Sequence, residues 1–130
     1  FCAMPGLARK MKGRFPKNLD GAPALLPTQN CQLRRDLERW FADQGIQPQV
    51  IGEFEDAAFA KIVASNGLGF IPISKRVLAE AVERYGFISL GKTADIQSQF
   101  YAITAESRLT HPAVLAITDR MRRTTGRKKT

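Results

Sequence analysis

The sequence predicts an α/β fold in which short buried strands alternate with amphipathic helices. The clearest evidence is the segment 53–72, where the end of a strand is followed by a helix, the turn Asn66-Gly67 and a second strand, Phe70-Ile71, before Pro72. Two strands joined by a helix within so short a stretch form a βαβ unit, and such units build parallel sheets. Apolar residues at helical spacing predict the buried face of the helix. They are Ala58, Phe59, Ile62 and Val63.

The elements before this segment show the same alternation. Residues 1–4 predict a short strand that Pro5-Gly6 interrupts, and residues 24–26 predict an apolar strand that ends before Pro27. A helix of about three turns follows, because apolar residues recur there at helical spacing, and Gly45 ends it. Residues 48–54 then predict the strand that leads into the βαβ unit. The apolar residues of the helix are Leu33, Leu37, Trp40 and Phe41.

The elements after Pro72 continue the pattern. Residues 77–82 supply the apolar face of another helix, and residues 87–90 predict a further short strand. An apolar strand is expected at residues 100–104. Thr110-His111-Pro112 indicates the start of a last helix, because proline is tolerated in the first helical turn.

Length and composition are those of one globular domain. The chain has 130 residues, of which 44% are apolar and 25% charged, and a single core can be built at that size. No apolar run approaches the roughly 20 residues that span a bilayer. The first residues do not resemble a secretory signal. Cys2 and Cys31 are isolated, which favours a reducing compartment, so we expect a cytoplasmic protein.

The net charge of +8 is concentrated at the two ends of the chain. Residues 1–17 contain five basic side chains and residues 120–130 contain six, with no acid in either stretch, so the span between them is mildly acidic. This distribution argues against a basic nucleic-acid-binding surface built into the fold. The basic tail either contacts nucleic acid or acidic membrane, or is simply solvated.

Two short stretches carry candidate binding residues. Thr28, Gln29 and Asn30 follow a strand and open a helix, where free N–H groups favour an anion; the alternative is that they cap the helix. Glu53, Glu55 and Asp56 place three carboxylates around Phe54, which would suit a cation. The alternative is that Glu55 and Asp56 complement the helix dipole while Glu53 faces solvent.

The chemistry of an enzyme is missing from the sequence. Cys31 at a helix start could sense oxidants, but an ordinary thiol is the simpler interpretation. His111 is the single histidine, and we find no set of acid, base and nucleophile around it. We therefore expect no enzymatic activity, no metal centre and no cofactor.

In the order of its motifs, the sequence resembles the C-terminal regulatory domain of LysR-type transcriptional regulators. The matching segments are Leu25–Pro27, Leu33–Leu37, Val63–Pro72, Phe100–Thr104 and Pro112–Val114. Three further segments, 15–23, 52–56 and 108–112, resemble the branch that activates sodium/proton antiporter genes. The resemblance extends to about residue 119.

This resemblance implies a periplasmic-binding-protein-like (type 2) regulatory domain with a mixed, mainly parallel sheet and flanking helices. It implies mostly one subdomain, with crossing strands. Residues 15–95 would be the second subdomain, residues 1–4 and 99–123 the hinge strands and returning helix of the first, and residues 124–130 a basic tail. The helix-turn-helix and half of the first subdomain are absent from this sequence.

The same resemblance implies an effector-sensing and oligomer-forming function. The effector, a small molecule or an ion, would contact residues that line the family's cleft: Thr28, Gln29, Asn30, Phe54 and Glu55. The resemblance implies that the chain associates with further copies of itself, in a dimer or tetramer. It also implies that DNA is bound only through the absent N-terminal domain, and that no membrane is involved. The alternative is a stand-alone solute-binding protein of the same architecture.

Overall fold

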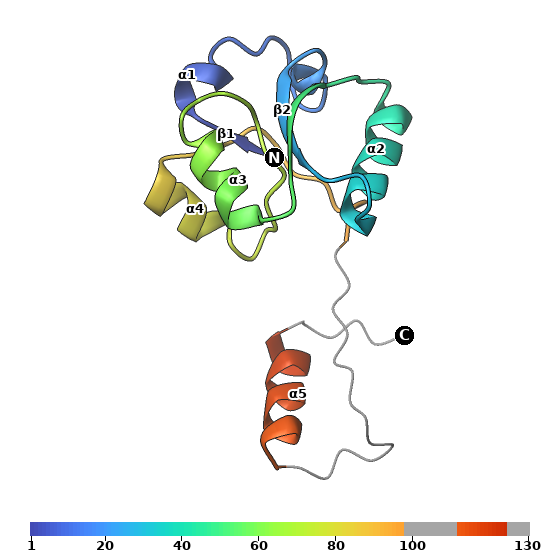
Figure 1. Cartoon of the computed structure of the whole chain (residues 1–130), viewed down its shortest axis with the longest axis vertical. Coiled ribbons are helices and arrows are strands. Elements are labelled where there is room, and N and C mark those ends of the chain that lie inside the picture. Colours follow the sequence, from blue (N-terminus) through green and yellow to red (C-terminus); the bar gives the residue numbers. More distant parts are fainter. Residues whose placement is uncertain (98–111, 125–130) are drawn as a thin grey trace. The chain divides into compact units, whose positions relative to one another are not determined.

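The computed structural model of the chain describes residues 1–97 and 112–124 (Figure 1). The chain divides into two compact units, residues 1–97 and 98–130. The elements of the first unit are β1 (Cys2–Ala3), α1 (Pro5–Ala8), the 3₁₀ helix η1 (Lys17–Leu19), β2 (Pro23–Pro27), α2 (Gln32–Gln44), β3 (Gln49–Phe54), α3 (Ala57–Ala64), α4 (Leu78–Tyr85) and β4 (Ile88–Ser89). In the second unit, α5 spans Pro112–Thr124.

The predicted order of strands and helices is confirmed across the first unit. Gly45 and Gly86 end α2 and α4 in the left-handed conformation, with φ angles of 59° and 75°. Glycine adopts this conformation without steric cost, which explains why both helices stop there. In the second unit, α5 begins at Pro112 as predicted. The strand expected at 100–104, which is the hinge strand predicted within 99–123, and residues 125–130 of the tail lie outside the described residues.

The sheet is assembled from two strand pairs and the short segment 70–71. β2 and β3 pair in parallel, and β1 and β4 pair antiparallel. Phe70 bridges to Ala24 in parallel and Ile71 bridges to Cys2 antiparallel, so residues 70–71 join the two pairs. The resulting order is β3, β2, 70–71, β1, β4. The fold is α/β as predicted, but one strand pair of each kind does not confirm a mainly parallel sheet.

Side chains alternate between the two faces of this sheet, as the period of a strand requires. Ala24 and Leu26 join the core on the face covered by α2, whereas Leu25 between them joins the core on the other face. Phe70 and Ile71 divide in the same way. Figure 1 shows α2 on one side of β2, and α3 and α4 on the other side. The first unit therefore consists of three layers with a core in each interface.

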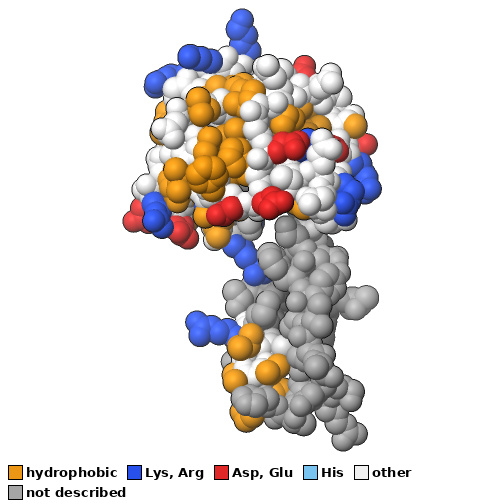
Figure 2. Space-filling view, in the orientation of Figure 1, with side chains coloured by type: hydrophobic (Ala, Val, Ile, Leu, Met, Phe, Trp, Pro, Cys, Tyr) orange, Lys and Arg blue, Asp and Glu red, His pale blue; other side chains and the backbone are white. Residues whose placement is uncertain are grey.

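Of the predicted apolar face of α3, only Val63 packs against the core. Phe59 is 54% exposed and Ile62 is 50% exposed, and the helix instead buries Ala64 against the sheet. The reason is that α3 is apolar around most of its circumference, so spacing alone does not select a face. A small residue permits the closest approach to the sheet. The larger Phe59 and Ile62 side chains remain exposed, and Figure 2 shows hydrophobic side chains gathered over α3.

None of the helices in the described part of the chain has the length and apolar character needed to cross a lipid bilayer.

Candidate functional site

The candidate site lies where two neighbouring parallel strands end. Pro27, the last residue of β2, is in register with Phe54, the last residue of β3. The backbone N–H of Thr28 donates to the carbonyl oxygen of Phe54 at 3.2 Å, which extends the ladder by one bond. Each strand is followed by a helix, α2 or α3. In open α/β sheets, ligands bind in the crevice outside such strand ends.

The loop Thr28–Asn30 presents polar groups at this edge. Thr28 is half-buried, Gln29 and Asn30 are exposed, and the Thr28 hydroxyl donates to Asn30 Oδ1 at 2.8 Å. The interpretation of these residues as helix caps is wrong. The N-cap of α2 is Cys31, and no side chain caps the helix.

Phe54 supplies an apolar wall beside this loop. Its side chain is half-buried against the core between the sheet and α3, and its ring lies 5.7 Å from the ring of Phe59, centroid to centroid. Glu55, the next residue, is exposed. Thr28 and Phe54 are therefore neighbours, with the more exposed Gln29, Asn30 and Glu55 around them in the chain.

Two of the three carboxylates near Phe54 are bonded within the protein. Asp56 caps α3, accepting from the backbone N–H of Ala58 at 2.7 Å. The alternative to a cation site was that Glu53 faces solvent, and this is only partly correct. Glu53 is 37% exposed and accepts a hydrogen bond from Arg34 at 2.7 Å. Among the described residues, no three Asp, Glu, His or Cys side chains come together as ligands for a metal ion.

Arg34 is the residue near the site that the sequence reasoning missed. It is 4% exposed, and it bonds Glu38, Glu53 and the carbonyl oxygen of Pro27. Burial alone would lower the pKa of Arg34, but the hydrogen bonds and charges of the two glutamates raise it above its usual value. The burial of Arg34 could have been predicted from the sequence, because Arg34 lies three residues before Leu37 and seven before Phe41, a spacing that places all three on the same face of α2.

The other candidate residues do not join this edge. Cys31 is half-buried and Cys2 is buried in the core, and both thiols are free. His111 lies outside the described residues. An open hollow of about 640 Å³ lies between α2 and the edge strand β3, but none of the predicted effector residues lines it. Its lining includes Leu26, Phe41 and Val50.

Comparison with known proteins identifies the family. Residues 1–126 match the LysR substrate binding domain family. The chain is 31% identical over 110 residues to the transcriptional activator protein NhaR of Escherichia coli (strain K12), and equally to NhaR of Shigella flexneri. The match covers 79% of this chain and 34% of each relative, so the chain spans about a third of their length. No solved structure matches. The family predicted from the sequence is confirmed, and the similarity to NhaR agrees with the predicted branch: the chain belongs to the LysR substrate binding domain family.

Proposed function

We propose that this chain senses a small molecule or an ion for a DNA-binding regulator, through a cleft whose wall carries Thr28, Gln29, Asn30, Phe54 and Glu55. The observation that carries the proposal is the bond between the Thr28 N–H and the Phe54 carbonyl. It fixes two strand ends side by side, at the edge where open α/β sheets bind ligands.

The chemistry of this edge favours an oxygen-rich or anionic small molecule. The side-chain amides of Gln29 and Asn30 can donate hydrogen bonds to oxygen atoms, and the Thr28 hydroxyl can do so by exchanging its bond to Asn30 for one to the ligand. The first backbone N–H groups of α2 have no side-chain cap, and a helix N-terminus favours negative charge. Phe54 adds apolar contact. A bare cation is less favoured, because Asp56 and Glu53 are already bonded within the protein.

The proposed protein context follows from the family. LysR-type regulators bind DNA through an N-terminal helix-turn-helix, so DNA would be a partner through that domain and not through residues 1–97. We further propose a non-enzymatic domain of periplasmic-binding-protein-like (type 2) fold that works as a dimer or tetramer in the cytoplasm, where the DNA lies. The family match favours this regulator over a stand-alone solute-binding protein.

The test is a titration of the 130-residue chain, followed by the NMR shifts of its backbone amides. The probes are sodium acetate and sodium succinate, with sodium chloride and potassium chloride as references. We expect a carboxylate to shift the amides of Thr28, Gln29 and Phe54. Thr28→Val should weaken binding by about 0.5–1.5 kcal/mol, the usual contribution of one hydrogen bond, and Phe54→Ala should weaken it as well.

Thr93→Val is the matched control. The Thr93 hydroxyl also donates to a side chain two residues on, Asp95 at 3.0 Å, but Thr93 follows β4, whereas Thr28 follows β2. If neither carboxylate nor sodium shifts these amides, or if Thr28→Val and Phe54→Ala both bind as wild type does, the assignment of the site fails.

A further inference from the structure

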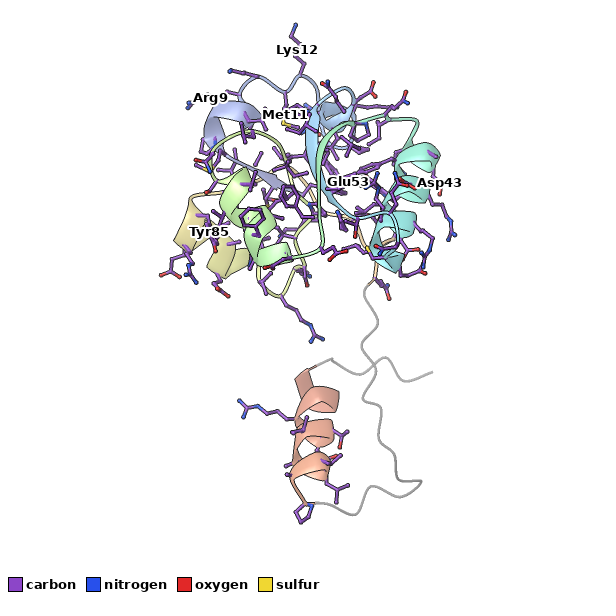
Figure 3. The ribbon with its side chains drawn as sticks, viewed as in Figure 1. Arg9, Met11, Lys12, Asp43, Glu53 and Tyr85 are labelled. Carbon is purple, nitrogen blue, oxygen red and sulfur yellow. The ribbon has the colours of Figure 1, made fainter. Side chains whose placement is uncertain are left out.

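Arg34 is a buried cation that connects three segments of the chain. From α2, its Nε donates to Glu38 at 2.8 Å, and its Nη1 donates both to Glu53 on β3 and to the Pro27 carbonyl at the end of β2, each at 2.7 Å. Figure 3 shows Glu53 on the side of the strands that faces α2. One side chain therefore bonds a helix to the ends of two strands.

Stability alone is a weak explanation for this arrangement. The buried Arg34 guanidinium loses hydration, whereas Glu38 and Glu53 remain 54% and 37% exposed. Replacing a buried charge with an apolar side chain is often neutral or stabilising. An apolar residue would fit the sequence pattern, since Arg34 lies on the buried face of α2 beside Leu37 and Phe41. What an apolar residue could not do is bond a backbone carbonyl and a carboxylate at once.

The atoms that Arg34 bonds lie next to the predicted effector residues. Pro27 directly precedes Thr28, and Glu53 directly precedes Phe54. Arg34 itself lies in the first turn of α2, just after the loop that contains Asn30. The bonds of Arg34 therefore fix the relative places of the segments on which the site is built.

We propose that Arg34 is the positioning residue of the effector site. It does not touch the ligand. It holds the ends of β2 and β3 and the start of α2 in the one arrangement in which the Thr28 loop and Phe54 face the same ligand. Binding sites need such support, because a loosely held site loses affinity. The inference rests on the proposed function, but its first test does not depend on any ligand.

That test measures amide hydrogen exchange in the 130-residue chain. Arg34→Met keeps an unbranched, apolar side chain and removes every bond of the guanidinium. We expect the Thr28 amide to exchange about tenfold faster, as when a charge-assisted bond no longer holds the strand end. The reference amide is Leu90, which donates to the Phe1 carbonyl at 2.9 Å in the β1–β4 part of the sheet. Its exchange should be unchanged.

Three further variants separate positioning from stability. Lys17→Met removes another cation that bonds backbone, at the Gln44 and Gly45 carbonyls at the far end of α2, and should leave Thr28 unchanged. Glu53→Ala and Glu38→Ala each remove one carboxylate from Arg34, but only Glu53 belongs to another segment. Glu53→Ala should therefore speed exchange at Thr28, and Glu38→Ala should not. If Arg34→Met does not fold, the comparison of Glu53→Ala with Glu38→Ala still tests whether Arg34 positions the Thr28 loop.

A second readout uses acetate as the probe. Arg34→Met and Glu53→Ala should weaken acetate binding about tenfold, and Glu38→Ala and Lys17→Met should leave it near the wild-type value. The proposal would be overturned if Arg34→Met accelerated amide exchange equally at Thr28 and Leu90, or left exchange at Thr28 unchanged. It would also be overturned if Glu53→Ala and Glu38→Ala had equal effects. If wild type binds no acetate, the proposed ligand class fails, while the exchange pattern still decides the role of Arg34.

Discussion

Gly69 lies where the turn after α3 enters the central segment of the sheet, and a side chain there would collide with β2. A Cβ atom at this position would lie 3.0 Å from the carbonyl oxygen of Pro23, 3.3 Å from its carbonyl carbon and 3.1 Å from Leu25 Cγ. Two of these atoms are backbone, and the Pro23 carbonyl already accepts from the Phe70 N–H at 2.9 Å. They cannot withdraw without breaking the ladder. Gly69→Val should therefore cost about 1–3 kcal/mol of folding free energy, the usual range for overpacking.

The assay is urea denaturation followed by the fluorescence of Trp40, the single tryptophan, which is 5% exposed. With a urea dependence of about 1–3 kcal/mol per molar, the midpoint should fall by about 1 M. Gly6→Val is the matched control, because a Cβ at Gly6 meets nothing within 4 Å; its effect should stay within about 0.5 kcal/mol. If Gly69→Val costs no more than Gly6→Val, the close approach of residues 69–70 to β2 is wrong.

Two further outcomes are expected. Iodoacetamide at pH 8 should alkylate the half-buried Cys31 and spare Cys2 until the chain is unfolded, because Cys2 is 1% exposed and burial raises the pKa of its thiol. Mass spectrometry of the labelled peptides shows which thiol reacted. Labelling of Cys2 in the folded chain would contradict its place in the core. The chain alone should not distinguish the regulator's operator from a scrambled duplex, because its net positive charge lies at the ends of the sequence, and such charge contacts phosphate without reading bases. Any residual binding should fall steeply as salt rises, and a titration that retains operator preference at about 200 mM salt would contradict this.

The order of elements was predictable because their local signals agree. Apolar spacing, a glycine stop and a proline at a strand end all point the same way in α2 and in the segment 53–72. The edge that holds Thr28 and Phe54 could also be anticipated, since it needs only two parallel strands, each followed by a helix.

The rest depended on contacts that spacing does not encode. Phe59 and Ile62 were expected inside, but a helix that is apolar on most sides approaches the sheet through its smallest residue, Ala64. Cys31 holds the N-cap position of α2 although Thr28 and Asn30 are of residue types that cap helices better. Arg34 was missed because its partners Pro27 and Glu53 come from other elements, 7 and 19 residues away in sequence.

The place of β1 in the sheet has a consequence for how the chain folds during synthesis. Cys2 lies between Ile71 on one side and Ser89 on the other, so one of the earliest residues described fills the middle of the sheet. Such pairings close long loops, and non-local contacts of this kind slow folding. At a translation rate of about 5–20 residues per second, β1 waits for several seconds before its partners leave the ribosome. In that interval β2 and β3 can pair, and residues 70–71 then fill the place between β2 and the waiting β1.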